Sequence, residues 1–434
     1  MNILIVGVSG FIGQHLYQAL RQSGHHLIGS SRHKISGINW QQFSFQQSQA
    51  VWLQQLQNID LVINTVGIYQ QVSQNPANKD SFSQVHDLGP KRLFEACREC
   101  KIKVIQISAI GAEQESPVSE FLQSKRNADQ YLLSHELPNI VLYPGIVLGE
   151  QGRTTQQLSL LASLYIIPLV FDRQEKIPLI SIYQLTEFIE QKIGHWPEKS
   201  LTAILIAKPE TMEELLNKLR HWMGLNKGHF FIIPRQLINT LFYYFPTLSI
   251  GAFNQSRTAM LADYSNKKLS TLKNSLPQSA SESLLAHKAT PCFSKRIQLK
   301  KLFYINSLVL GIIWIISGLS SIINIELSRE LMLLMGIKGN WGDSIIIIAA
   351  LADMVLGILL WLGLWNARLM QWSLYGQITV MLIYSIILTI TIPMFWLHPF
   401  APIVKNLAIL VLAIYLLEEI KKTPNTVKEE SYHV

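Results

Sequence analysis

The sequence predicts a parallel α/β domain followed by a membrane domain of helices, and two observations support this. From the N-terminus to about residue 225, short segments rich in Val and Ile alternate with amphipathic helical segments. From about residue 301, the chain consists of long apolar blocks. Charged residues make up only 15% of the 434 residues, a low content for a soluble enzyme. We therefore expect three regions: 1–225, a linker or membrane-surface region over 226–300, and a membrane domain over 301–420.

A glycine-rich turn follows the first predicted strand, which covers residues 2–6. Gly7, Gly10 and Gly13 lie between this strand and a helical pattern. Gly7 allows a tight turn, Gly10 lets the backbone approach a pyrophosphate, and Gly13 lets the helix pack closely on the strand. The N-terminus of that helix then offers unpaired N–H groups to phosphates. This arrangement predicts a dinucleotide-binding Rossmann domain.

The later strands and helices extend the same pattern. Strands are predicted at 26–30, 60–67, 103–108 and 139–143, and helices at 91–100 and 120–135. This alternation predicts a doubly wound parallel sheet with right-handed crossovers. The second strand ends at Ser31 and Arg32 without an acidic residue for a ribose 2′-hydroxyl, so we expect NADP(H) rather than NAD(H). The alternative is that Arg32 is an ordinary loop arginine.

Five segments together resemble the atypical short-chain dehydrogenase/reductase superfamily, including the branch of the Rossmann-type accessory subunit of respiratory complex I. They are GVSGFIGQHL, LVINTVGI, IQISAIGA, FLQSKRNADQYL and YPGIVLG, and the resemblance covers about residues 1–225. In catalytic relatives, the Tyr and Lys of a YxxxK pair perform the proton chemistry and hold the nicotinamide ribose. Here the pair is Phe121 and Lys125, with Ser108 upstream. Phenylalanine cannot exchange a proton, so classical acid catalysis at this position is lost.

The resemblance implies a set of site residues. Ser108 and Lys125 are the expected catalytic residues, with Lys125 also a ribose ligand. The expected cofactor contacts are Gly7, Ser9, Gly10, Phe11, Ile12, Gly13, Ser31, Arg32, Thr65, Val66, Gly67, Lys125, Tyr143, Pro144 and Gly145. No metal site is expected. Cys97 and Cys100 form a CxxC inside a predicted helix without a second pair, and three cysteines do not suggest a disulfide framework.

The small lobe expected over 150–225 is apolar, which favours a hydrophobic substrate over a sugar. Residues 158–171 form an apolar run that is too short to span a bilayer, so we assign it to a core. Thr211 to Glu214 forms a capping box that opens a helix. Residues 230–245 are predicted as a core helix or, preferably, a helix lying on the membrane, and 275–295 as a loose linker.

Four apolar segments near 303–325, 344–365, 371–393 and 401–418 predict four transmembrane helices. Four basic residues between 295 and 301 indicate that the preceding domain lies on the cytoplasmic side of the inner membrane. Because the number of predicted spans is even, both termini are expected on that side. Residues 317–319, Asp353 and 396–406 resemble the DoxX-like family, in which quinone- or thiol-linked redox roles are implied for some relatives. Asp353 near the middle of its helix is expensive in a bilayer, and Gln377 is its expected partner; a functional role and a packing role stay open.

Two main functions follow from these observations. The first is a membrane-anchored NAD(P)(H)-dependent oxidoreductase that acts on a lipophilic, quinone- or isoprenoid-like substrate without the classical Tyr. The second is a non-catalytic nucleotide-binding scaffold or redox sensor of a membrane complex, which Phe121 favours. An epimerase or dehydratase acting on a nucleotide sugar is a third function, against which Phe121 and the apolar lobe argue. The expected partners are the lipid bilayer, a lipophilic small molecule and a membrane protein complex. No nucleic acid is expected as a partner, because no basic run with interleaved aromatic residues occurs in residues 1–290.

Overall fold

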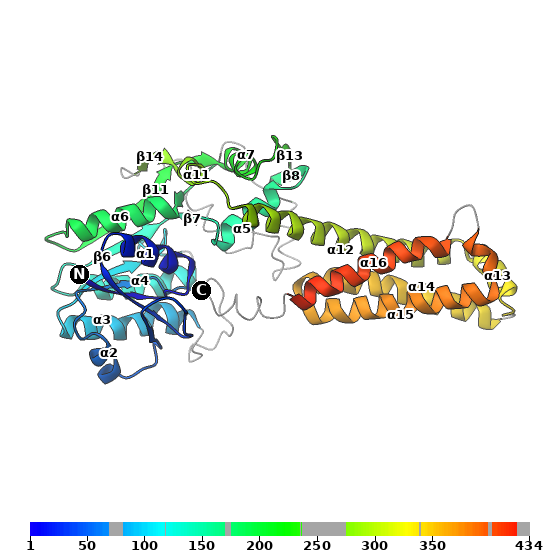
Figure 1. The fold of residues 1–434 in the computed structure, drawn as a ribbon, viewed down its shortest axis with the longest axis horizontal. Helices are drawn as coiled ribbons and strands as arrows, with labels where there is room; N and C mark the ends of the chain where they lie inside the picture. The colour runs from blue at the N-terminus through cyan, green and yellow to red at the C-terminus, as the bar shows by residue number, and fades with distance from the viewer. Residues whose placement is uncertain are drawn as a thin grey trace. The chain divides into compact units, whose positions relative to one another are not determined.

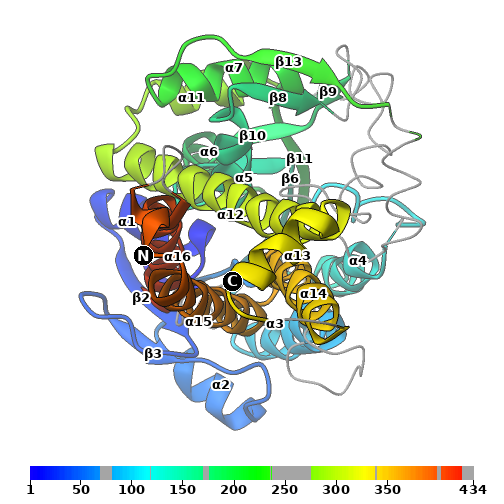
Figure 2. The same ribbon diagram turned by 90° about the vertical axis from the view of Figure 1, so that its right-hand side faces the viewer.

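The computed structural model describes residues 1–68, 81–117, 119–169, 175–234, 236, 275–337, 340–397 and 402–422. The chain forms two compact units, one built mainly from Met1–Ile297 and the other from Gln298–Ser431. Figures 1 and 2 show the elements of each unit from two directions.

The first unit is built around an eight-stranded sheet of order β14-β11-β6-β5-β4-β1-β2-β3, in which every neighbouring pair is parallel. The strands are β1 (Asn2–Val6), β2 (His26–Ser31), β3 (Trp40–Gln42), β4 (Leu61–Asn64), β5 (Lys103–Ile107), β6 (Ile140–Pro144), β11 (Leu201–Lys208) and β14 (Ser275–Ser279). The order of β1 to β6 is that of a Rossmann sheet, with its switch point between β1 and β4. The predicted doubly wound sheet is confirmed.

Side chains alternate between the two faces of the sheet, and each face is covered by helices. Ile3 and Ile5 of β1 pack with α1 (Phe11–Gln22) and α6 (Ile182–Gly194), while Leu4 and Val6 pack on the opposite face. That opposite face is covered by α2 (Gln49–Gln55), α3 (Gly89–Glu99) and α4 (Glu120–Leu133). The π-helical turn η1 (Ser83–Leu88) leads directly into α3.

A smaller lobe follows β6 and has its own apolar core. Its elements are β7 (Ile146–Leu148), α5 (Arg153–Ala162), β8 (Ile166–Leu169), β9 (Lys176–Ile177), β10 (Leu179–Ser181), β12 (Glu210–Thr211), α7 (Met212–Trp222), β13 (His229–Ile232) and α11 (Ala280–Leu285). The predicted core character of 158–171 agrees with buried Leu158, Ile167 and Leu169, and the predicted capping box opens α7. These apolar side chains fill a core, so they are not evidence for a hydrophobic substrate pocket.

Two expectations for residues 226–300 are wrong in the described parts. Residues 229–232 form strand β13, which pairs in parallel with β8, instead of beginning a helix. The rest of the predicted 230–245 helix lies almost entirely outside the described residues. Residues 275–285 are no loose linker, since β14 joins the main sheet and Ser279 and Glu282 form a capping box on α11. Backbone pairing and capping stabilise this segment despite its polar composition.

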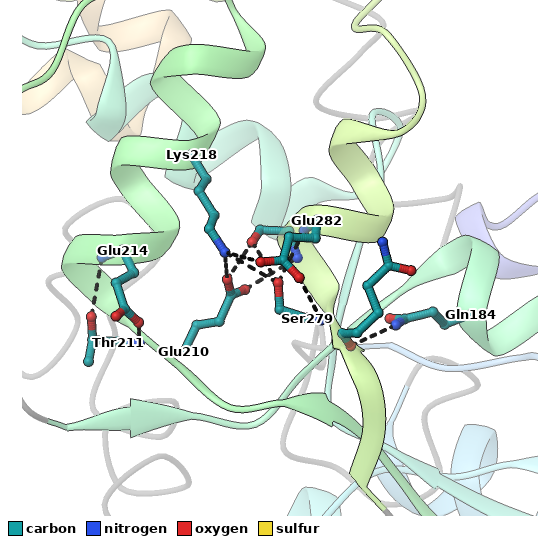
Figure 3. A network of polar contacts seen from close by, with 9 residues as sticks. Gln184, Glu210, Thr211, Glu214, Lys218, Ser279 and Glu282 are labelled. Atoms are coloured by element: carbon teal, nitrogen blue, oxygen red, sulfur yellow. Dashed lines mark hydrogen bonds and ion pairs between the residues drawn. The ribbon is translucent and has the colours of Figure 1, made fainter.

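A buried carboxylate ties this late segment to the small lobe (Figure 3). Glu210, only 3% exposed, accepts hydrogen bonds from Lys218 Nζ and from Ser281 Oγ, both at 2.5 Å. Lys218 Nζ also contacts Ser279 Oγ at 3.3 Å and Glu282 Oε1 at 3.2 Å. These contacts join residues 61 to 71 positions apart in the sequence. Phe293 and Ile297 also pack in the core of the small lobe, which agrees with a first unit that extends to Ile297.

The second unit is helical (Figures 1 and 2). It contains most of α12 (Pro291–Ile323), then α13 (Ile325–Leu334), α14 (Asn340–Leu362), η2 (Gly363–Trp365), α15 (Ala367–Thr391), η3 (Pro393–Trp396) and α16 (Pro402–Lys422). Large apolar side chains point outward, for example Ile348 at 67% exposed and Ile390 at 76%. An apolar outer surface of this kind suits a bilayer, where outward-facing side chains contact lipid.

Three of the four predicted spans are confirmed by length and composition: the helices at Pro291–Ile323, Trp341–Trp365 and Ala367–Thr391. The fourth segment does form a helix, α16, and packs in the bundle through Ala413 and Leu416. Among the described residues, α16 is not apolar over enough of its length to count as a candidate span. Charged Lys405, Glu418 and Glu419 limit its uncharged stretch to residues 406–417. At 1.5 Å per residue, that stretch is shorter than the ~30 Å apolar core of a bilayer.

Candidate functional site

The glycine loop has the geometry that a dinucleotide requires. Gly7 has a φ of +87°, and its N–H donates to Ser30 O at 2.9 Å. A Cβ at Gly13 would lie 2.4 Å from Gly7 O, so α1 packs directly against the loop. The Thr65 hydroxyl donates to Val6 O at 2.9 Å and lies 3.2 Å from Gly7 O, which fastens β4 to the loop. The loop therefore lies at the switch point of the sheet, where such folds bind dinucleotides.

Ser31 and Arg32 are the residues predicted to contact the adenosine side of the cofactor. Ser31 is 1% exposed, and its hydroxyl accepts from Trp40 Nε1 at 2.8 Å and donates to His33 O at 2.7 Å. Ser31 thus stabilises the end of β2 and does not present its hydroxyl to a phosphate. Arg32 follows β2 directly at the same edge of the sheet. Of the two residues that suggested a 2′-phosphate site, only Arg32 keeps that role as a prediction.

The structure brings together Ser108, Lys125 and a residue that sequence reasoning did not identify, Asp129. Ser108 Oγ donates to Asp129 Oδ2 at 2.5 Å, and Asp129 is fully buried. Lys125, one turn earlier on α4, is 6% exposed, and its Nζ lies 3.4 Å from Ile107 O. A Cβ at Gly67 would be 3.5 Å from Lys125 Nζ, so the ammonium lies beside the segment that follows β4.

Burial sets the protonation of this pair. Desolvation lowers the pKa of Lys125 to about 8, against the opposing effect of Asp129. Desolvation also raises the pKa of Asp129 to about 6, partly offset by the Ser108 hydrogen bond and by Lys125. Both groups therefore titrate near neutral pH, as groups that exchange protons in enzymes commonly do.

A second residue that sequence reasoning did not identify, His86, packs against Phe121. The two rings meet edge to face with centroids 5.1 Å apart, and Lys125 Nζ is 5.8 Å from the Phe121 centroid. The structure thus places the Phe121 ring beside the Lys125 ammonium. Within the described residues, Lys125 is the titratable group next to this ring that has a pKa suited to proton donation.

His86 is a positioning residue. Its Nε2 accepts from the Ile68 N–H at 2.9 Å, so its Nδ1 carries the proton and donates to Ser124 Oγ at 3.3 Å. Ser124 Oγ in turn donates to Phe121 O at 2.8 Å. Burial, assisted by Lys125, lowers the pKa of His86 well below its usual range. A neutral histidine with both nitrogens occupied joins the segment after β4 to α4 and is badly placed to transfer a proton.

The remaining predicted residues line the same end of the sheet. Phe11 packs on Gly149 and Gly152, where a Cβ at Gly149 would be 2.6 Å from the Phe11 ring. Tyr143 in β6 is 5% exposed, and Pro144 ends this strand. The N–H of Ser108 donates to Leu142 O, and the N–H of Ile110 donates to Pro144 O. The loop and strand-end positions Ser9, Gly10, Ile12, Val66 and Gly145 follow β1, β4 and β6 as expected. Their contacts with a cofactor stay predictions.

Comparisons with known proteins agree with this arrangement. Residues 3–161 match the NAD dependent epimerase/dehydratase family, and residues 311–414 match the DoxX-like family. The chain is 29% identical over 172 residues to the epimerase family protein YfhF of Bacillus subtilis (strain 168), covering 35% of this chain and 57% of that protein. The aligned part is thus a little over half the length of this relative.

The chain is also similar to two solved structures. MoeE5 in complex with UDP-glucose and NAD is 16% identical, covers 68% of this chain and 99% of its own, and has a TM-score of 0.49. UDP-N-acetylglucosamine 4-epimerase from Bacillus cereus is 15% identical, covers 66% of this chain and 98% of its own, and has a TM-score of 0.47. By the family matches, the chain combines an N-terminal domain of the NAD-dependent epimerase/dehydratase type with a C-terminal DoxX-like membrane domain.

Proposed function

We propose that this protein is a membrane-anchored, NAD(P)H-dependent reductase that acts on a carbonyl group of a lipophilic, quinone- or isoprenoid-like substrate. The observation that carries the proposal is the buried Lys125 ammonium beside Gly67, at the end of the sheet where the glycine loop lies. The strongly packed loop around Gly7 and Gly13 fits a pyrophosphate. When bound, the dinucleotide supplies the hydride.

Lys125 takes the role that a tyrosine has in classical relatives. With a pKa of about 8, its ammonium is protonated at neutral pH and donates a proton to the substrate oxygen as the carbonyl carbon receives hydride. The net gain of one hydride and one proton gives an alcohol from an aldehyde or ketone and a hydroquinone from a quinone, and Lys125 regains its proton from water. Ser108, held by Asp129, orients the substrate-facing end of β5. Phe121 excludes water from this side of the lysine.

The cofactor preference and the substrate class have weaker supports. Arg32 after β2 favours the 2′-phosphate of NADP(H), because no acidic side chain follows this strand to bind a 2′-hydroxyl. Lipophilicity of the substrate is inferred from the membrane domain alone. A titration of the full chain with NADPH and NADH tests the cofactor preference. Arg32→Ala should weaken NADPH binding about tenfold more than NADH binding, which is the equivalent of one charge-assisted contact.

The central experiment measures NADPH oxidation by the full chain in detergent with a panel of lipid-soluble quinones and isoprenoid aldehydes. Lys125→Met should reduce turnover about 100-fold or more, since general acid catalysis contributes that much. Lys91→Met, which removes an α3 lysine paired with Asp87, is the matched control and should change nothing. Wild-type binding of NADPH with no turnover on any acceptor would refute the reductase.

A second function is favoured by specific contacts. The hydroxyls of Ser108 and Ser124 already donate to Asp129 and to Phe121 O, so neither is free to replace the tyrosine as an acid. A nucleotide-binding scaffold or redox sensor of a membrane complex needs no such acid. If the wild type is inert and Phe121→Tyr gains activity, this second function is correct.

We also propose that the first unit faces the cytoplasm at the inner membrane, where NAD(P)H is available. The basic cluster between residues 295 and 301, in the first turns of α12, supports this orientation. Cys100 and Cys292 are exposed and belong to this unit, so they report its side of the membrane. A membrane-impermeant maleimide should label them only after cells are opened. Labelling in intact cells, absent in the Cys100→Ala/Cys292→Ala variant, would reverse the orientation.

A further inference from the structure

Three helices of the second unit each place a polar side chain in the interior of the bundle. Trp314 on α12, Asp353 on α14 and Gln377 on α15 are 6%, 5% and 0% exposed. Asp353 is the one acidic or basic side chain between residues 344 and 365. Polar groups buried in an apolar bundle are expensive unless they have hydrogen-bond partners.

Contacts between the helices put these side chains at neighbouring levels. Ser317 Oγ donates to Asp353 Oδ2 at 3.3 Å, and Trp314 lies about one turn before Ser317 on the same helix. Gln377 Nε2 donates to Leu356 O at 3.2 Å, about one turn beyond Asp353 on α14. Trp314 also belongs to the same apolar cluster as buried residues of α15. The three polar residues thus lie at neighbouring levels of the bundle interior.

Close backbone packing fixes the helices on both sides of Asp353. A Cβ at Gly318 would lie 2.3 Å from Ala350 O, and a Cβ at Gly357 would lie 2.8 Å from Gly311 O. Ala350 and Gly357 precede and follow Asp353 on α14, so α12 cannot slide or withdraw at this level without breaking tight contacts. The polar region is therefore held in place by the backbone.

Each of the three side chains keeps one buried polar atom without a partner among the described residues. These atoms are Trp314 Nε1, Asp353 Oδ1 and Gln377 Oε1, that is, one donor and two acceptors. Buried polar atoms in proteins nearly always have a hydrogen-bond partner, so three such atoms at neighbouring levels point to a further polar group. The complementary group is one that can both accept and donate, and an uncharged hydroxyl does so.

We propose that Trp314, Asp353 and Gln377 form a binding site inside the membrane bundle for the hydroxyl-bearing head group of a membrane-soluble molecule. The hydroxyl oxygen accepts from Trp314 Nε1, and the hydroxyl proton goes to Asp353 Oδ1 or Gln377 Oε1. The site lies entirely within the second unit and does not depend on the reductase activity of the first.

The test uses the full chain in lipid nanodiscs and a photoreactive alkylphenol, with mass-spectrometric mapping of the labelled peptides. Label should appear in α12, α14 and α15 near the three residues, and excess 4-nonylphenol should compete with it while nonylbenzene, which lacks the hydroxyl, should not. Gln377→Leu and Trp314→Phe should each weaken competition roughly fivefold, the equivalent of about 1 kcal/mol for one hydrogen bond. Asp353→Asn should act similarly.

Asp343→Asn is the matched control, because Asp343 lies on the same helix but is paired with Arg329 near its first turn. It should leave competition unchanged. Thermal unfolding of each variant identifies any that fail to fold. If Asp353→Asn is unstable, Trp314→Phe still tests the site, because it removes the indole N–H and keeps an aromatic ring. Equal competition by nonylbenzene, or unchanged competition in both Gln377→Leu and Trp314→Phe, would overturn the proposal and leave the layer as a packing device that binds water.

Discussion

Gly13→Ala is expected to abolish tight dinucleotide binding while the rest of the first unit stays folded. The added Cβ would meet Gly7 O at 2.4 Å and both Thr65 Oγ1 and Val8 Cα at 2.9 Å, and two of these three atoms are backbone. Ordinary carbon contacts need about 3.4 Å or more, so α1 must move away from the loop by about 1 Å. Overpacking of this kind costs about 2 kcal/mol, and a 1 Å displacement at a binding site costs on the order of 100-fold.

Calorimetric titration with NADPH and thermal unfolding of the full chain measure the two effects separately. We expect Kd to rise about 100-fold and Tm to fall by about 5 °C, since 1 kcal/mol corresponds to roughly 2–4 °C for a domain of this size. Gly194→Ala is the control, because a Cβ there meets nothing within 4 Å. Wild-type affinity and stability in Gly13→Ala would refute the role assigned to the loop.

Three further predictions concern groups described above. Lys125 must be protonated to act as an acid, and its pKa is about 8. Turnover should therefore be constant below about pH 8 and fall about tenfold per pH unit above it. A turnover profile that stays flat to about pH 10 would contradict the role of Lys125 as the acid. His86→Ala should lower the free energy of unfolding by about 2–3 kcal/mol, because it leaves the buried Ile68 N–H without its acceptor, whereas exposed His26→Ala should cost little in the same denaturant titration. Glu210→Gln should speed amide hydrogen exchange over 275–285 by about tenfold or more, since it removes the charge that holds Lys218, and exposed Glu187→Gln should leave exchange there unchanged.

The main sheet was predictable from sequence because its signals are local. Buried parallel strands read as apolar runs, and the glycine turn after residue 6 is specified by backbone conformation and close approach. The strand β14 was not predictable in this way. It is short and polar, and its place depends on Glu210, a carboxylate about 65 residues earlier that accepts from Ser281. Contacts over such separations leave no periodic pattern in the sequence.

The candidate site was predictable only in part, for a similar reason. Lys125 and Ser108 followed from a motif, but Asp129 and His86 have no motif of their own. Asp129 lies one turn after Lys125 on α4, so helical spacing alone offered a signal for it. His86 comes from a separate element and reaches the site through a hydrogen bond to the Ile68 backbone, which only the fold brings near.

The buried Lys125 and Asp129 pair distinguishes the two proposed functions more sharply than Phe121 does. Removing an ammonium and a carboxylate from water is costly, and the cost exceeds the attraction between them unless further partners contribute. Ser108 partners Asp129, whereas the Lys125 ammonium has a long hydrogen bond to Ile107 O and lies over the Phe121 ring. A scaffold needs Lys125 only as a ribose ligand, whereas the proposed reductase also needs its proton. A bound anionic dinucleotide would stabilise the ammonium under either function, so NADPH should raise the pKa of Lys125, and a turnover profile that shifts to higher pH with cofactor saturation would assign the lysine to catalysis.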